Sequence, residues 1–157
     1  MVRAVRALVP ATTATSAAQL VLAFVAVELA LYAVHRAMHA APWLWRFHRW
    51  HHAPGPVRWH RGWRIHPVDA ALFALAVTAA TAAVGASPFT AAGVIVARRA
   101  WTLALHADLR WPATLVDHWL ATPAIHRRHH DEAAPAANFA PTLAWVDRLF
   151  GTWAPPR

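Results

Sequence analysis

The sequence alternates long apolar segments with segments crowded with histidine, and this alternation restricts the folds open to the chain. The first apolar segment is SAAQLVLAFVAVELALYAV, residues 16–34, and the second is VDAALFALAVTAATAAVGA, residues 68–86. A third, TAAGVIVARRAWTLALHA, residues 90–107, is interrupted by Arg98 and Arg99. Because a helix of about 20 apolar residues spans the hydrocarbon core of a bilayer, we predict an all-α integral membrane bundle with about three apolar spans.

The composition agrees with a membrane location. Of the 157 residues, 58% are hydrophobic and ten are Trp, a residue that gathers at membrane–water interfaces. The formal net charge is +8, but the basic residues lie beside Trp and between apolar segments. We therefore expect this charge to face anionic lipid, and we expect the membrane rather than nucleic acid as the partner.

The distribution of arginine predicts the orientation. Residues 35–66 contain six Arg, whereas the turn after the second apolar segment contains none. The positive-inside rule then places the histidine-rich segments on the cytoplasmic side, as a helical cap, and the N-terminus outside. Glu28 lies within the first apolar segment and should face protein or water. Arg98 and Arg99 either extend to the membrane surface or face a polar interior.

The chain has twelve histidines and no cysteine, so any metal must be held by nitrogen or oxygen. Eight of the histidines form three motifs, HRAMH, HRWHH and HRRHH: His35, His39; His48, His51, His52; His126, His129, His130. Residues three and four apart share one face of a helix, so each motif should offer its rings to one point. Neutral imidazole is the commonest metal ligand, and eight rings exceed the needs of one tetrahedral ion. The pattern predicts two ions, or one ion with supporting histidines.

The other histidines carry separate expectations. His106 ends the third apolar segment on the side of the motifs and is predicted to be a ligand. His66, before Pro67, is open between supporting a ligand and a structural role, while His60 and His118 are expected at the surface or in packing. Acidic side chains can orient the N–H groups of ligating histidines, and three are candidates: Asp69, Asp108 and Asp117.

The ordered set HRAMH…FHRWHH…RIHPVD…LHADLR…TPAIHRRHH…NFAPTLAWVDRLFGT resembles the fatty acid hydroxylase / sterol desaturase superfamily of membrane enzymes. The resemblance covers about residues 28–153 and implies a single membrane domain over residues 1–157. It implies a centre of two iron ions, with zinc as a substitute in purified protein. The implied ligands are His35, His39, His48, His51, His52, His106, His126, His129 and His130, with His66 and Asp108 as supporting residues.

The activity implied by the resemblance is O₂-dependent hydroxylation or desaturation of a fatty acyl, sterol or isoprenoid lipid. The electrons must come from an external donor, such as a ferredoxin or a cytochrome-type carrier, because the sequence has no flavin, haem or ferredoxin motif. Carotenoid hydroxylation is an alternative within this class. Outside it, the alternatives are a membrane metal-binding or transport protein and a catalytically inactive relative.

Overall fold

The computed structural model describes residues 17–109, 111–112 and 114–156, and in these residues all regular secondary structure is helical. This confirms the all-α prediction for the described part of the chain. The elements are α1 (Ala17–Ala40), α2 (Pro42–His48), η2 (Trp59–Trp63), α3 (Pro67–Ala83), α4 (Pro88–Leu105), η3 (Leu115–His118), α5 (Pro123–His129) and α6 (Ala144–Leu149).

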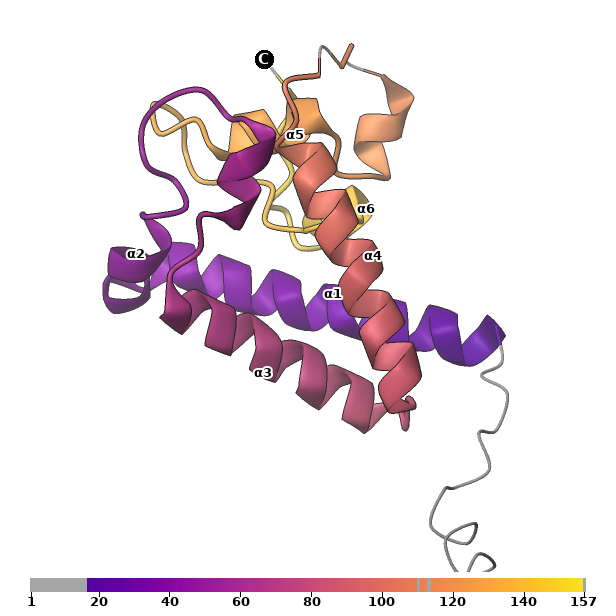
Figure 1. Ribbon diagram of the computed structural model, residues 1–157. Coiled ribbons are helices and arrows are strands. Elements are labelled where there is room, and N and C mark those ends of the chain that lie inside the picture. The colour runs from indigo at the N-terminus through magenta and orange to yellow at the C-terminus, as the bar shows by residue number, and fades with distance from the viewer. Residues whose placement is uncertain (1–16, 110, 113, 157) are drawn as a thin grey trace, which may run out of the picture.

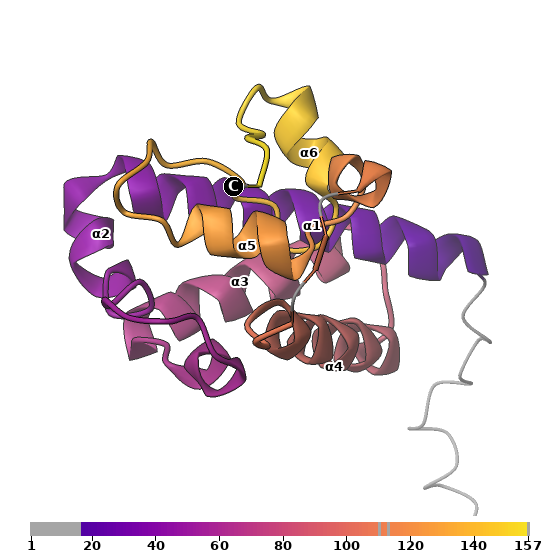
Figure 2. The ribbon, with the colours of Figure 1, turned by 90° about the horizontal axis from the view of Figure 1, so that it is seen from above.

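Helices α1 and α3 lie side by side and antiparallel, and α4 crosses them at an angle (Figure 1). The segments from the second half of the chain, including α5 and α6, cover one side of α1 (Figure 2). Helix α2 lies at the C-terminal end of α1. This arrangement brings the end of α1, the turn after α2, the end of α4 and helix α5 together.

Proline and hydroxyl side chains determine where four of the helices begin. Pro42, Pro67, Pro88 and Pro123 each stand in the first turn of a helix, where the missing N–H costs no hydrogen bond and the fixed φ favours the helix. The N-cap of α5, Thr122, accepts a hydrogen bond from the backbone N–H of Ile125. These local signals start α2, α3, α4 and α5 at positions that the sequence alone specifies.

The main apolar core joins the three long helices. Its buried side chains come from α1, α3 and α4: Val27, Leu31, Ala76, Val77 and Val94. Full burial of a Val or Leu side chain stabilises a fold by about 1.5–3 kcal/mol. The long helices therefore form a packed frame, and the histidines are placed relative to it.

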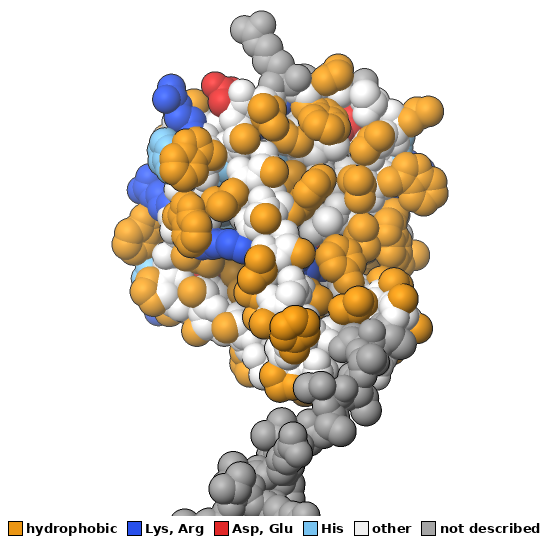
Figure 3. Space-filling view, turned by 45° about the vertical axis from the view of Figure 1, so that its right-hand side comes forward, with side chains coloured by type: hydrophobic (Ala, Val, Ile, Leu, Met, Phe, Trp, Pro, Cys, Tyr) orange, Lys and Arg blue, Asp and Glu red, His pale blue; other side chains and the backbone are white. Residues whose placement is uncertain are grey.

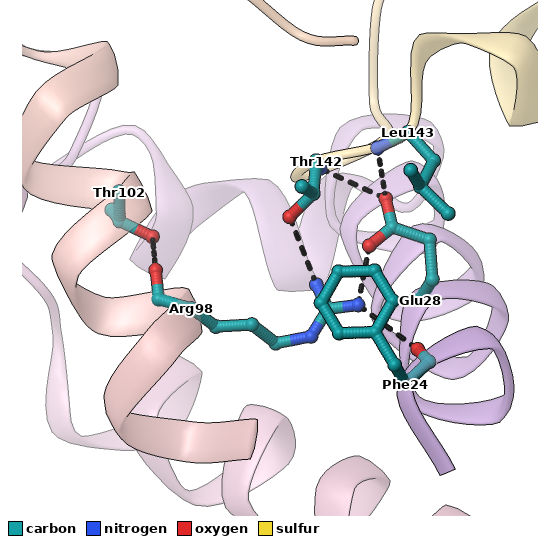
Figure 4. A network of polar contacts seen from close by, with 6 residues as sticks. All are labelled: Phe24, Glu28, Arg98, Thr102, Thr142 and Leu143. Carbon is teal, nitrogen blue, oxygen red and sulfur yellow. Dashed lines mark hydrogen bonds and ion pairs between the residues drawn. The ribbon is translucent and has the colours of Figure 1, made fainter. Parts of the chain in front are cut away.

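A buried ion pair holds α1, α4 and the segment before α6 together (Figure 4). Glu28 is fully buried; one of its carboxylate oxygens accepts from the backbone N–H groups of Thr142 and Leu143, at 2.8 and 2.7 Å. The other oxygen pairs with Arg98, which also donates to the carbonyl of Phe24 at 3.2 Å. Glu28 thus faces protein, as expected, and Arg98 faces a polar interior rather than the membrane surface.

One helix in the described residues, α1, is long and apolar enough to cross a membrane; α3 is apolar but has 17 residues, and α4 contains two arginines. Length and composition therefore support one span and a shorter apolar helix, while the three-span bundle and the cytoplasmic cap stay predictions. Large apolar side chains are exposed on these helices, among them Leu22, Leu75, Phe89 and Val96. Hydrophobic side chains are spread over one face of the molecule, where charged side chains are few (Figure 3). The orientation argument that used the N-terminus falls on residues 1–16, outside the described residues.

Candidate metal centre

The nine histidines predicted as ligands lie in two adjacent groups. The five-histidine group consists of His35, His39, His48, His52 and His129, and the four-histidine group consists of His51, His106, His126 and His130. Within each group one ring nitrogen of every residue lies within 4.8 Å of the others. The groups contain only histidine, so the arrangement offers two all-imidazole sites. That these histidines bind metal stays a prediction.

The i, i+4 pairs share a group, while the histidine between them belongs to the other. In HRWHH, His48 and His52 belong to the five-histidine group and His51 to the four-histidine group. In HRRHH the assignment is reversed, because His126 and His130 join the four-histidine group and His129 the five-histidine group. The expectation that each motif offers its rings to a single point therefore holds for HRAMH, whose two histidines share the five-histidine group, and is wrong for HRWHH and HRRHH. On a helix, positions i+3 and i+4 lie on opposite sides of position i, so one motif can point at two neighbouring sites.

In the five-histidine group, hydrogen bonds from behind fix three rings. The Nδ1–H groups of His35 and His129 donate to the backbone carbonyls of Phe139 and Ala137, at 2.7 and 2.8 Å. His48 donates its Nδ1–H to the buried carboxylate of Asp69 at 3.0 Å. When Nδ1 carries the proton, the lone pair is on Nε2 and points into the group, which is the arrangement that metal-binding histidines adopt.

Four of the five rings in this group have an Nε2 atom without a protein partner in the described part of the chain. The Nε2 atoms of His39, His48, His52 and His129 are buried and make no hydrogen bond among the described residues. A buried polar atom without a partner costs about 1–3 kcal/mol, so four of them converging at one point are unfavourable unless a ligand occupies that point. A metal ion satisfies all four, and the residues present therefore fit a metal.

The four-histidine group converges through Nε2 atoms as well. Nε2 of His126 lies 3.1 Å from Nε2 of both His106 and His130, and Nε2 of His106 lies 3.3 Å from that of His51. Two nitrogens bound to one ion at about 2.1 Å lie roughly 3 Å apart, which is the spacing observed. Behind them, the Nδ1–H of His106 donates to the carbonyl of Thr102 at 2.8 Å. The Nδ1–H of His51 donates to the carbonyl of Arg64 at 3.1 Å.

The surroundings keep these rings neutral. Burial, together with the neighbouring His106 and His48, lowers the pKa of His51 to about 3. Burial is also the main cause that lowers the pKa of His126, His129 and His130 well below the ordinary value, with neighbouring histidines adding to it. Neutral imidazole is the form that donates a lone pair to a metal, so the groups are ready to bind metal at neutral pH.

The remaining predicted residues have other places. His66 is the N-cap of α3, its Nδ1 accepting from the N–H of Val68 at 3.1 Å, and it belongs to neither group. Asp69 orients His48, as expected, whereas Asp108 is exposed and no hydrogen bond joins it to a histidine among the described residues. Asp117 closes a capping box with Thr114. His60 is exposed, and His118 stacks on Trp153 with ring centroids 4.8 Å apart; both agree with the expectation.

The sequence did not reveal that the C-terminal segment supports the five-histidine group. Asn138 has a positive φ of 60° and is tied through its side chain to the backbone of Ala154. Asp147 accepts from the N–H groups of Phe139 and Ala140, both at 2.8 Å. These contacts fix the carbonyls of Phe139 and Ala137, which accept the hydrogen bonds from His35 and His129 respectively. The signal was present in the NFAP and WVDRLFGT motifs, but only the fold links them to the histidines.

Two cavities reach the histidines from different sides. One, of about 410 Å³, is mostly apolar and lies between α1, α3 and α4, bounded by residues such as Leu31, Phe73 and Val77 and ending at histidines of both groups. The other, of about 750 Å³, has arginines and acidic residues in its walls and reaches only the five-histidine group, at His39, His52 and His129. The site is therefore accessible to an apolar chain from one side and to polar molecules from the other.

Comparisons with known proteins agree with this geometry. Residues 20–152 match the family described as fatty acid hydroxylase. The chain is also similar to the ornithine lipid hydroxylase OlsE of Rhizobium tropici, with 33% identity in an alignment of 146 residues that covers 88% of this chain and 43% of that protein. The chain thus spans less than half the length of this relative, and no solved structure matches it significantly. The family match covers both histidine groups, and the chain therefore belongs to the fatty acid hydroxylase family.

Proposed function

We propose that the protein is a membrane-bound, non-haem di-iron oxygenase that hydroxylates a lipid. One iron would be held by the five-histidine group and the other by the four-histidine group. The observation that carries the proposal is the convergence of unpartnered, buried Nε2 atoms beside an apolar cavity. Family membership and the similarity to a lipid hydroxylase support it. Bound iron would supply the redox chemistry that activates O₂.

The protein's own residues would position the substrate. The apolar cavity between α1, α3 and α4 would take a lipid from the bilayer, because its walls include exposed positions on α3 and α4 such as Ala74 and Ile95. The cavity is also lined by His35, His48 and His51. Hydroxylation replaces C–H by C–OH with one oxygen atom of O₂, and the other atom leaves as water after uptake of two electrons and two protons. The apolar walls would keep bulk water away from the reacting carbon.

The electrons would enter from the polar side. Arg46, Arg49 and Arg64 are exposed in the walls of the larger cavity, above the five-histidine group. Complementary charge steers protein association, so this surface suits an acidic carrier such as a ferredoxin, or a cytochrome-type protein. The excess of arginine in residues 35–66 supports a cytoplasmic position for this surface.

Hydroxylation is favoured over desaturation because both the family and the relative are described as hydroxylases. An isoprenoid substrate such as a carotenoid remains a competing substrate class, since the apolar walls do not specify the kind of chain. A protein that only binds or transports metal would not need the apolar cavity that ends at the histidines. Lipid analysis therefore separates these functions.

The test uses the full chain expressed in a bacterium, with lipid extracts compared by mass spectrometry and the purified protein analysed for iron. The wild type is expected to add one oxygen atom to a lipid and to hold about two iron ions per chain. His51→Ala and His129→Ala, one from each group, should abolish the product and lower the iron content together. His60→Ala, an exposed position outside both groups, is the control. Turnover retained in either ligand variant would contradict the proposal.

A further inference from the structure

Arg98 and Arg99 are neighbours on α4, but only Arg98 forms an ion pair with a carboxylate among the described residues. Arg98 is buried and pairs with the carboxylate of Glu28. Arg99 is half-buried and pairs with no carboxylate among the residues that the structure describes. One of its N–H groups donates to the carbonyl of Gly62 at 3.2 Å. Its guanidinium stacks over Trp63, 4.1 Å from the ring centroid. These contacts hold the side chain in place without neutralising its charge.

The unneutralised charge lies in the wall of the apolar cavity. Arg99, Thr102 and His106 all line this cavity, and their spacing of three and seven residues places them on one face of α4. An ionisable group in such surroundings is costly and, in membrane proteins, commonly marks a substrate path. A fixed guanidinium has a planar pair of donors that matches a carboxylate or a phosphate. The missing counter-charge is therefore of the kind that a lipid headgroup supplies.

We propose that Arg99 binds an anionic group, a carboxylate or a phosphate, of the lipid substrate. The proposal rests on the proposed function, because it takes the apolar cavity as the substrate site. Seven residues of α-helix correspond to about 10 Å, which is the separation of Arg99 from His106 along α4. A lipid held by its charged group at Arg99 would thus present carbons close to its headgroup, rather than the end of its acyl chain, to the histidine groups.

The experiment measures binding and needs no turnover. Purified full-length protein in a neutral detergent is titrated with N-dodecanoylglycine, with its uncharged methyl ester and with dodecyl phosphate. We expect the wild type to bind the acid at least about tenfold more tightly than the ester, and Arg99→Gln to bind the two about equally. Arg58→Gln, an exposed arginine outside the cavity, should keep the wild-type ratio. Tighter binding of the acid or of the phosphate distinguishes an amino-acid lipid from a phospholipid.

An acid-to-ester ratio near one in the wild type, or an unchanged ratio in Arg99→Gln, would overturn the proposal. If Arg99→Gln does not fold, Arg99→Lys takes its place: it keeps the charge but loses the planar fork. Its ratio should fall about threefold, and an unchanged ratio would again overturn the proposal. If the protein binds the acid more tightly through Arg99 but oxidises no lipid, this inference is supported and the proposed function is overturned. If the protein hydroxylates a lipid but its acid-to-ester ratio does not depend on Arg99, only this inference is overturned.

Discussion

The two histidine groups differ in number and in what holds them. The five-histidine group draws on α1, α2 and α5, and it is supported by Asp69 and by carbonyls of the C-terminal segment. The four-histidine group is supported by two backbone carbonyls, those of Thr102 and Arg64. One group thus depends on contacts between segments more than 100 residues apart, such as His35 with Phe139. The other depends partly on α4, whose own turn positions His106.

The difference teaches that the two sites should respond differently to the same kind of change. Loss of one ring leaves four imidazoles in the five-histidine group but three in the four-histidine group. The only carboxylate that supports a ring among the described residues, Asp69, also belongs to the five-histidine group. We therefore expect the four-histidine site to be the more sensitive to loss of a ligand, and the five-histidine site to loss of its supports.

The largest effect is predicted for loss of a ligand from the four-histidine group. His106→Ala leaves three histidines there, so iron content should fall from about two to about one per chain, with at least about a 1,000-fold loss of lipid hydroxylation. His39→Ala leaves four ligands in the other group and removes a ring that, unlike His129, has no hydrogen bond to the backbone among the described residues, so this variant should retain more iron. Metal analysis and product formation measure both. Equal iron loss in the two variants would contradict the proposed difference between the groups.

A smaller effect is predicted for the carboxylate behind His48. Asp69→Asn keeps the size of the side chain but removes the charge that receives the His48 proton. Loss of such a partner typically lowers metal affinity about 10- to 100-fold. Iron release to a chelator should become biphasic, with one ion released faster. Asp108→Asn, at an exposed acid, is the matched control. If Asp69→Asn released iron at the same rates as the control, Asp69 would not support a metal ligand.

Next is the C-terminal support of the same group. Asp147 is buried, and burial raises its pKa although its carboxylate accepts three hydrogen bonds, from Phe139, Ala140 and Thr152, that lower it. Asp147→Asn places an amide N–H against a backbone N–H, which should cost about 1–3 kcal/mol of unfolding free energy. The midpoint temperature of thermal unfolding should therefore fall, and iron should be lost from the five-histidine group alone. Iron lost equally from both groups would mean that Asp147 supports the whole fold rather than this group.

The sequence could predict which histidines lie close together but not how they divide into two groups. The spacing in HRAMH, HRWHH and HRRHH is local information, and so are the prolines that start four of the helices. Which ring joins which group depends on how α2 and α5 face each other, and that is determined by packing. Packing also determines the ion pair between Arg98 and Glu28, which are 70 residues apart. It likewise determines the hydrogen bond from His35 to the carbonyl of Phe139, 104 residues away. Distant contacts of this kind leave no periodic signal in a sequence.

The smallest effect is predicted for His66, the residue whose role the sequence left open. Its ring accepts the N–H of Val68 and packs on Phe47, with ring centroids 4.7 Å apart. Loss of an N-cap costs about 1 kcal/mol, so His66→Ala should lower the unfolding free energy by about this amount while both irons stay bound.

His66→Asn separates the two roles, because asparagine is a good N-cap but cannot replace an imidazole that supports a ligand. A structural role predicts that Asn restores most of the stability and that neither variant changes iron content. Asp69 lies in the first turn of the same helix, so loss of the cap could disturb the five-histidine group indirectly; Asn would prevent that loss. Iron loss in both variants would show that His66 supports the metal centre itself, and would add a third kind of support to the five-histidine group.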